Sequence, residues 1–380
     1  MKIIKKTILL IVVAGLVLTM TSCRGSHELN ELHIVHSIAI DKAPNEKVLL
    51  TAEIAKLTAS GQQPKGMQDR TFFLSAEGDS LFEAGRLIRA KSDRTLLWGH
   101  AAVILISQAV AKQGIEDQIK SIRRLRQFRN STQIYISEDD AYKTLQLPTP
   151  MASINSQVLR GLTEGGVSTA LTQKVMLIDV YSELVNRYRD LSIPSIRIIK
   201  DREQNERKLL QSSGLYIFRG DKLAGLMGPT ETMGYLRSFN KMVGTTETLP
   251  CGAGKTMTFE NINNRSNIQI KLDEQMKPSV RIDVYASLNL NSTQCDEVTI
   301  TPKVIADWEN KLNEDIRAEI NQFIRFSKKH KSDLLGIGEK IHRKFPKQWS
   351  RMKEEWRDTY SSTSFTVDVE TRIDHTNFIF

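Results

Sequence analysis

The sequence predicts an α+β fold in which mixed or antiparallel sheets are each packed with helices. Short runs of alternating apolar and polar residues, typical of half-buried strands, recur along the chain. Helical patterns stand between them in irregular clusters and not in a regular β-α-β-α order. A length of 380 residues, with 21 Gly and 10 Pro, indicates a folded chain of two to three domains.

The charge balance and the cysteine count exclude several classes of protein. The chain has 53 Lys and Arg against 44 Asp and Glu, a formal charge of +9. This mild excess suits a protein beside an anionic membrane and does not indicate nucleic acid as a partner. Three cysteines are too few for a disulfide-dense scaffold or a four-thiolate metal site.

Residues 1–22 have the pattern of an export signal. Basic residues precede an apolar run at 8–20, which is too short to span a bilayer. Met20-Thr21-Ser22-Cys23 resembles the bacterial lipobox, in which the cysteine receives a diacylglyceryl group and an N-acyl chain. Two or more acyl chains give a stable anchor where one does not. The alternative is an ordinary signal peptide with an incidental cysteine.

The two other cysteines, Cys251 and Cys295, would then lie outside the cytoplasm. They could form a disulfide or remain two separate thiols. The sequence leaves both possibilities open, because geometry decides whether a bridge can form.

The N-terminal half begins with a predicted hairpin of strands at 33–41 and 47–55. Ser80 and Glu83 form a capping box that opens a helix to about residue 91. Further predicted elements are strands at 71–74, 101–106, 132–137 and 193–199, and helices at 115–129 and 173–190.

The charged segment Lys200–Lys208 is predicted to be a linker. We therefore expect an N-terminal domain at 23–200 and a C-terminal domain at 206–380, with a further boundary near residue 300. Arg219-Gly220-Asp221 reads as a hairpin turn. After it we expect a helix at 229–240 and strands at 256–259, 267–272 and 280–290.

The last third of the chain has the clearest pattern. Thr301 as N-cap and Pro302 start a long helix with an apolar residue at every fourth position: Val304, Trp308, Leu312, Ile316, Ile320 and Ile324. A second helix is predicted at 333–345, and a third places Trp349, Met352 and Trp356 on one face. Alternation from Phe365 to Ile373 predicts a half-buried strand, which we expect to be antiparallel in its sheet.

No motif in the sequence indicates a catalytic or metal site. Gly254-Lys255-Thr256 lacks the first glycine of a phosphate-binding loop, since residue 249 is Leu. His33 and His36 would point to opposite faces of a strand, so they are not expected to share a metal. We therefore expect no enzyme. The basic runs at 123–129 and 325–331 are read as solvated helix faces or as contacts to lipid headgroups or an acidic partner loop.

Three stretches of the chain resemble the C-subunit lipoproteins of nutrient germination receptors in endospore-forming bacteria. They are CRGSHELNELHIVHSIAIDK at Cys23–Lys42, the segment Ser75–Ser107 with SAEGDSLFEAGRLI and WGHAAVILIS, and LLGIGEKIHRKFPKQWSRMKEEW at Leu334–Trp356. GLYIFRGDKLAGLM is a fourth, weaker match. The chain departs from the family at Arg24-Gly25, where Trp-Asp is usual.

The resemblance implies a non-enzymatic subunit, lipid-anchored on the extracytoplasmic face of the inner spore membrane, that docks on the receptor A and B membrane subunits. It implies several α+β domains, and no catalytic residue, cofactor or firmly expected small-molecule ligand. We expect partner contacts in three segments, at Glu28, Leu29, Glu31, Leu32, Trp98, His100, Lys340 and His342. The alternative is a lipid-anchored solute-binding protein, which predicts a deep cleft between two similar α/β lobes.

Overall fold

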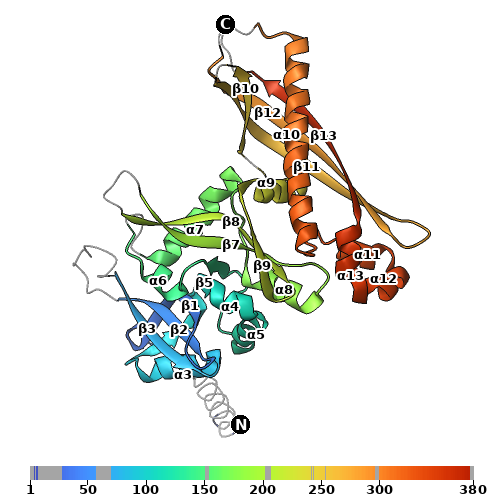
Figure 1. Cartoon of the computed structure of the whole chain (residues 1–380). Coiled ribbons are helices and arrows are strands. Elements are labelled where there is room, and N and C mark those ends of the chain that lie inside the picture. The colour runs from blue at the N-terminus through green and yellow to red at the C-terminus, as the bar shows by residue number, and fades with distance from the viewer. Residues whose placement is uncertain are drawn as a thin grey trace.

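The computed structural model describes Ile4, Lys6 and residues 28–56, 70–149, 154–201, 207–240, 242, 244–252, 254–295 and 299–376. Cys23 and the lipobox-like residues before it lie outside these residues. Figure 1 shows two bodies, one around each sheet. The first holds a nine-stranded sheet and the second a four-stranded sheet crossed by one long helix.

The nine-stranded sheet has the order β3-β2-β1-β5-β6-β7-β8-β9, and β4 pairs with the start of β1. β1 pairs antiparallel with β2, as the hairpin prediction requires. The bounds are β1 Leu32–Lys42, β2 Val48–Ala55, β3 Thr71–Gly78, β4 Thr95–Leu97, β5 Val103–Ser107, β6 Gln133–Ser137, β7 Ser192–Lys200, β8 Lys208–Arg219 and β9 Lys222–Met227.

The centre of this sheet is parallel and its edges are antiparallel, so the sheet is mixed, as the predicted fold class allows, although the sequence shows no regular β-α-β alternation. β1, β5, β6 and β7 are parallel neighbours joined through helices. Every residue of β5 and β6 is buried, so these short strands carry no polar-apolar alternation. The helices α4 and α6 after them have only six residues each, too few for a clear helical period.

Helices cover both faces of the nine-stranded sheet, and each face has its own apolar core. One face is covered by α3 Leu81–Ala90, α4 Gln108–Gln113, α5 Glu116–Leu125 and α8 Leu177–Asn186, the other by α6 Ala141–Gln146 and α7 Asn155–Gly166.

Two buried carboxylates of the sheet hold the start of α6 and of α7. Asp41 Oδ1 accepts from the Ala141 amide at 2.6 Å, and Glu53 Oε1 accepts from the Asn155 amide at 3.0 Å. These amides are unpaired donors of a first helical turn. Burial raises the pKa of both carboxyls.

The predicted linker at 200–208 joins two paired strands, since Lys200 lies opposite Lys208. The sheet therefore continues past this segment into β8 and β9. Side chains of β8 alternate between two cores. Tyr216 and Phe218 face the core of the first body, and Leu215 and Ile217 face the core of the second. Strand β8 thus couples the two bodies. Its turn into β9 contains Gly220 at φ 67°, as the hairpin prediction requires.

The second sheet has the order β10-β11-β12-β13. It comprises β10 Thr246–Gly252, β11 Lys255–Leu272, β12 Pro278–Thr293 and β13 Ser364–His375, with helices α9 Pro229–Ser238, α10 Pro302–Lys329, α11 Ile337–Lys344, α12 Pro346–Met352 and α13 Trp356–Ser362. The two sheets differ in strand number and order, so within the described ranges they are not the two similar lobes that the solute-binding alternative predicts.

The prediction of the long helix is confirmed. Thr301 caps α10 through the Val304 amide, and its fourfold apolar stripe is buried except for half-buried Val304. The expected direction of the last strand is wrong, because β13 runs parallel to β12. Helix α10 returns along the sheet before β13 begins, so the connection is a β-α-β crossover (Figure 1).

Strand β11 is a single strand of 18 residues, where the sequence predicts two separate strands. Register shifts near Phe259 and Asn263 interrupt its alternation, and they account for the missed continuity.

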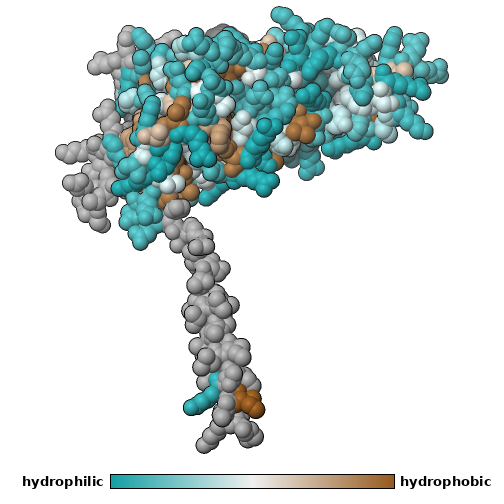
Figure 2. Space-filling model, turned by 90° about the horizontal axis from the view of Figure 1, so that it is seen from below, coloured by the Kyte–Doolittle hydropathy of each residue, from teal (hydrophilic) through white to brown (hydrophobic). Residues whose placement is uncertain are grey.

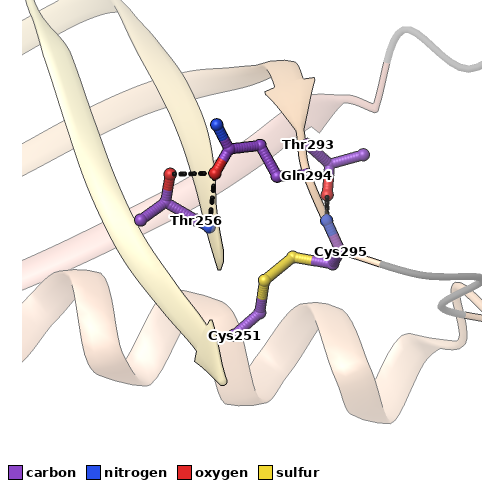
Figure 3. Close-up of a disulfide and its surroundings, with 5 residues drawn as sticks. All are labelled: Cys251, Thr256, Thr293, Gln294 and Cys295. Carbon is purple, nitrogen blue, oxygen red and sulfur yellow. Dashed lines mark hydrogen bonds between the residues drawn. A yellow bond between two sulfur atoms is a disulfide. The ribbon is translucent and has the colours of Figure 1, made fainter. Parts of the chain in front are cut away.

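Cys251 and Cys295 form a disulfide (Figure 3), which settles the pairing that the sequence leaves open. Their Cα atoms are 6.1 Å apart, within the range that a bridge requires. The bond ties β10 to the chain just after β12. Beside it, the Gln294 side-chain oxygen accepts from the backbone amide of Thr256 at 3.2 Å.

Candidate functional site

Two of the three predicted contact segments come together in space. The turn η1 (Leu29–Glu31) leads into β1, whose Leu32 pairs with Thr95 of β4. Strand β4 continues directly into the turn η2 (Trp98–His100). Segments more than 60 residues apart in the sequence therefore meet at the start of β1. Of their side chains, Glu28, Glu31 and His100 are exposed, and Leu32 and Trp98 are half-buried.

An apolar groove opens beside these segments, between α3, η2 and the end of α5. We call it the α3 groove. It encloses about 240 Å³, and its apolar wall is formed by Leu81, Phe82, Leu96, Trp98, Leu125 and Phe128. The rings of Trp98 and Phe128 are in tilted contact, with centroids 6.0 Å apart and planes at 39°. Seen from below in Figure 2, this side of the molecule carries apolar patches between hydrophilic side chains.

Helix α3 forms one wall of the α3 groove. Only part of the helix packs onto the sheet, so other side chains of the helix line the groove. The Ser80 hydroxyl accepts from the Glu83 amide at 3.2 Å and starts the helix, as the capping-box prediction requires. The Glu83 carboxylate reaches the amide of Asp79 and not that of Ser80. Leu81, Ala84 and Ile88 pack onto the sheet. Phe82 is left 50% exposed at the mouth of the groove.

Gly85 keeps the groove open. A Cβ atom at this position would meet only Leu50 Cδ2, at 3.9 Å, which is ordinary van der Waals contact. Glycine is unfavourable inside a helix, and no steric requirement accounts for it here. The absent side chain leaves free space against Leu50.

The charged groups at the α3 groove are cations. Arg86 and Arg89 line it and are exposed, and its lining contains no carboxylate. The Arg86 guanidinium lies over the Phe82 ring, 5.1 Å from its centroid. Helix α5 ends at Leu125, and its C-cap residue Arg126 has φ 52°. Arg124, Arg126 and Arg129 are exposed around this end of the helix.

One residue of the basic run at 123–129, Arg123, makes contacts within the fold. Arg123 donates to the Asn130 side chain and lies 5.0 Å over the Tyr181 ring. Burial and the nearby His100 lower the pKa of His36.

His33 also makes side-chain contacts within the fold. Its Nε2 lies 2.8 Å from Asp93 Oδ1, and its ring meets Phe72 edge to face. Among the described residues, no three His, Cys, Asp or Glu side chains are grouped so that they could hold a metal ion.

The third predicted segment lies elsewhere, on α11 of the second body, which Figure 1 shows well apart from α3. Lys340 is exposed. His342 stacks on Tyr188, with centroids 4.4 Å apart and planes at 17°, and meets Trp349 edge to face. His342 therefore lies in the joint between the two bodies.

The joint itself is a polar cluster that the sequence analysis missed. Asp190 follows α8 and Asp333 precedes α11. The Asp190 amide donates to the Asp333 carbonyl, and the Asp333 amide donates to the Asp190 carboxylate. Asp333 accepts from the amides of Ile337 and Gly338 and from Trp356 Nε1. Burial raises the pKa of the Asp333 carboxyl to about 7. An aspartate just before a helix is a recognisable capping signal, but its partner 143 residues away is not visible in the sequence.

Within the described part of the chain, no helix is both long and apolar enough to cross a membrane.

The chain matches two family models in succession. Residues 25–198 match the spore germination protein N-terminal domain, and residues 213–377 match the spore germination B3/GerAC-like C-terminal domain.

Relatives of similar length match along almost the whole chain. Spore germination protein KC of Bacillus subtilis (strain 168) is 24% identical over 94% of this chain and 92% of its own. Spore germination protein GerQC of Bacillus cereus is 19% identical over 90% of this chain and 97% of its own. The crystal structure of the GerBC protein has a TM-score of 0.58 at 16% identity, covering 89% of this chain and 97% of that chain, and shows the same fold. The chain belongs to the GerAC-like family of spore germination proteins.

Proposed function

We propose that this chain is the lipid-anchored, non-enzymatic subunit of a nutrient germinant receptor, and that it docks on and supports the A and B membrane subunits. The observation that carries the proposal is the match of both family domains, in order, from residue 25 to residue 377. Full-length relatives named as spore germination proteins support the same role.

The anchor in this proposal is Cys23, carrying a diacylglyceryl group and an N-acyl chain. Glu28 lies five residues after it. An extended chain covers at most about 3.6 Å per residue, so Glu28 would lie within about 18 Å of the anchored cysteine. The start of β1, and β4 beside it, would therefore face the extracytoplasmic surface of the inner spore membrane.

We propose the surface formed by Glu28, Leu29, Glu31 and Leu32 with Trp98 and His100 as the docking contact for the membrane subunits. The pairing of β1 with β4, which lead from and into these two segments, brings the segments close together. Lys340 and His342 remain a predicted second contact. Of these two residues, the exposed Lys340 is the better candidate, since His342 is engaged with Tyr188.

The role is tested by deleting the gene in its spore-forming host and measuring germination with separate nutrients. Loss of the response to one nutrient is expected. Normal germination with every nutrient, in a strain that also lacks paralogues, would contradict the role. Binding of amino acids or sugars by the purified chain, measured by calorimetry, would instead favour a solute-binding protein.

The docking surface is tested with a photo-crosslinking amino acid at position 100, in native membranes. A crosslink to one of the membrane subunits is expected. The matched control places the same amino acid at Tyr285, which is 54% exposed on the second body. Equal crosslinking from both positions, or from Tyr285 alone, would show that this surface is not the contact.

A further inference from the structure

We propose that the α3 groove holds an acyl chain of an anionic phospholipid, with Arg86 and Arg89 bound to its phosphate. The inference rests on the proposed function in one respect, that the chain lies at a membrane. It adds a lipid-binding site in the folded body, separate from the covalent lipid on Cys23.

The lining of the groove suits a segment of a hydrocarbon chain. Its wall is apolar and aromatic, from Leu81 and Phe82 on α3 to Trp98 and Phe128 on the opposite side. An exposed Phe at the mouth, with Leu87 42% exposed on the same helix, extends the apolar surface outwards. Side chains of this kind bind lipid by burial of apolar area.

The charge at the mouth of the groove selects an anionic headgroup. Arg86 and Arg89 stand one turn apart on α3, and both are exposed. Guanidinium groups bind phosphate oxygens in a forked geometry that other cations do not match. The lining offers no carboxylate that would repel a phosphate. An acidic protein segment would find the same cations, but it would need hydrogen-bond partners for its backbone, and this apolar wall is poor in them.

The position of the groove brings it to the bilayer. Thr95 of its lining pairs with Leu32, which lies nine residues after Cys23. That length of chain reaches at most about 32 Å, so the anchor holds the groove close to the headgroup region. A membrane lipid is consequently the ligand present at the highest local concentration.

The test uses the chain from residue 23 to 380 with Cys23→Ala, so that no covalent lipid contributes. We expect it to bind vesicles of phosphatidylglycerol and phosphatidylcholine in equal parts, and not vesicles of phosphatidylcholine alone. Replacing Arg86 and Arg89 together by Gln is expected to lower the affinity about 25-fold, because each cation near an anionic surface contributes about fivefold. Arg265 and Arg351 are exposed arginines of the second body, and their double replacement by Gln is the control.

The fluorescence of Trp98 reports whether the acyl chain enters the groove. The chain has four Trp, and the other three lie in the core of the second body. Phosphatidylglycerol with brominated acyl chains should quench the Trp98 fluorescence, and Trp98→Phe should remove the quenched component. Gly85→Leu fills the groove, keeps both arginines and replaces an unfavourable helical glycine, so it should fold and yet lose the quenching. Gly161→Ala on α7, with open space around it, is the matched helix control.

Three results would overturn the inference: equal binding to both kinds of vesicle, equal binding by the double arginine variant, or unchanged quenching in Gly85→Leu. Crosslinking of the groove to a membrane subunit without quenching would show a protein partner in place of a lipid. The vesicle and quenching results leave the proposed receptor role untouched, since the mass of Cys23 and the germination response test it separately, whereas a crosslink from the groove to a membrane subunit would support the proposed docking contact.

Discussion

Asp190 and Arg357 form an ion pair between the two bodies of the molecule, with Arg357 Nη2 3.3 Å from Asp190 Oδ1. The same carboxylate accepts from the amides of Gly220 and Asp333. Three segments distant in the sequence thus meet at one side chain, 10% exposed, at the base of the hairpin β8–β9.

Arg357→Gln should lower the free energy of unfolding by about 1 kcal/mol, because Asp190 loses a partner while its amide donors remain. Urea unfolding followed by circular dichroism measures the change. Lys353→Gln, an exposed cation four residues earlier, is the control and should change little. A larger loss of unfolding free energy in the control than in Arg357→Gln would show that the ion pair does not stabilise the contact between the two bodies.

Asp333 should make the chain less stable as the pH rises from about 4 to about 7. Its folded pKa, raised by burial to about 7, exceeds the unfolded value of about 4, so only the folded state holds the proton between these values. Stability is then highest below the unfolded pKa and decreases towards the folded one, by at most about 1.4 kcal/mol per pH unit.

Asp333→Asn should remove this part of the pH dependence, although it costs stability. The amide has one acceptor oxygen where the carboxyl group has two, so its NH2 group would face either the Ile337 amide or the Gly338 and Trp356 donors. Unfolding midpoints of the two chains at a series of pH values measure the difference. Asp358→Asn, at a side chain 73% exposed, is the control and should keep the wild-type slope. An unchanged slope in Asp333→Asn would mean that Asp333 titrates at its ordinary pKa.

The disulfide should contribute about 3–4 kcal/mol to the stability of the C-terminal sheet, since it closes a loop of 44 residues. Replacing Cys251 and Cys295 together by Ser should lower the urea midpoint, and a reductant should lower it in the parent chain alone. Equal midpoints in parent and double variant would contradict the contribution. Unfolding is best measured in a chain that carries Cys23→Ala.

Helix α10 covers the open edge of β13 with polar side chains. Asn313 Oδ1 accepts from the Thr371 amide at 2.7 Å, Glu309 Oε1 accepts from the Ile373 amide at 2.9 Å, and Arg317 donates to the Val367 carbonyl at 3.2 Å. These bonds use groups that an exposed edge would offer to another strand.

Asn313→Ala should cost about 1–2 kcal/mol and promote association of the chain, because it leaves a partly buried amide unpaired. Sedimentation at increasing concentration measures association, and urea unfolding measures stability. Asp307→Ala, at an exposed position of the same helix, is the control. A monomeric variant at every concentration would show that the edge is protected by other means.

Cys23→Ala should move the chain from the membrane to the soluble fraction when receptor partners are absent, if Cys23 carries the acyl chains we propose. Detergent phase partitioning measures the shift. Intact mass of the native protein is the independent check, and an unmodified terminus would contradict the anchor.

Local sequence patterns predicted correctly those features that depend on residues close together in the chain. The cap at Thr301, the fourfold stripe of α10, the capping serine of α3 and the turn at Gly220 all depend on residues a few positions apart. The same holds for the alternation of β13, which is present as predicted. Family resemblance also lay in contiguous segments and could be read directly.

Tertiary structure alone decided how these elements combine. The parallel pairing of β13, the parallel centre of the first sheet and the joint of Asp190 with Asp333 each join residues far apart in the chain. A strand pattern records which face is buried but not the direction of its neighbour. The α3 groove likewise exists only because α3, η2 and the end of α5 pack around the space that Gly85 leaves open.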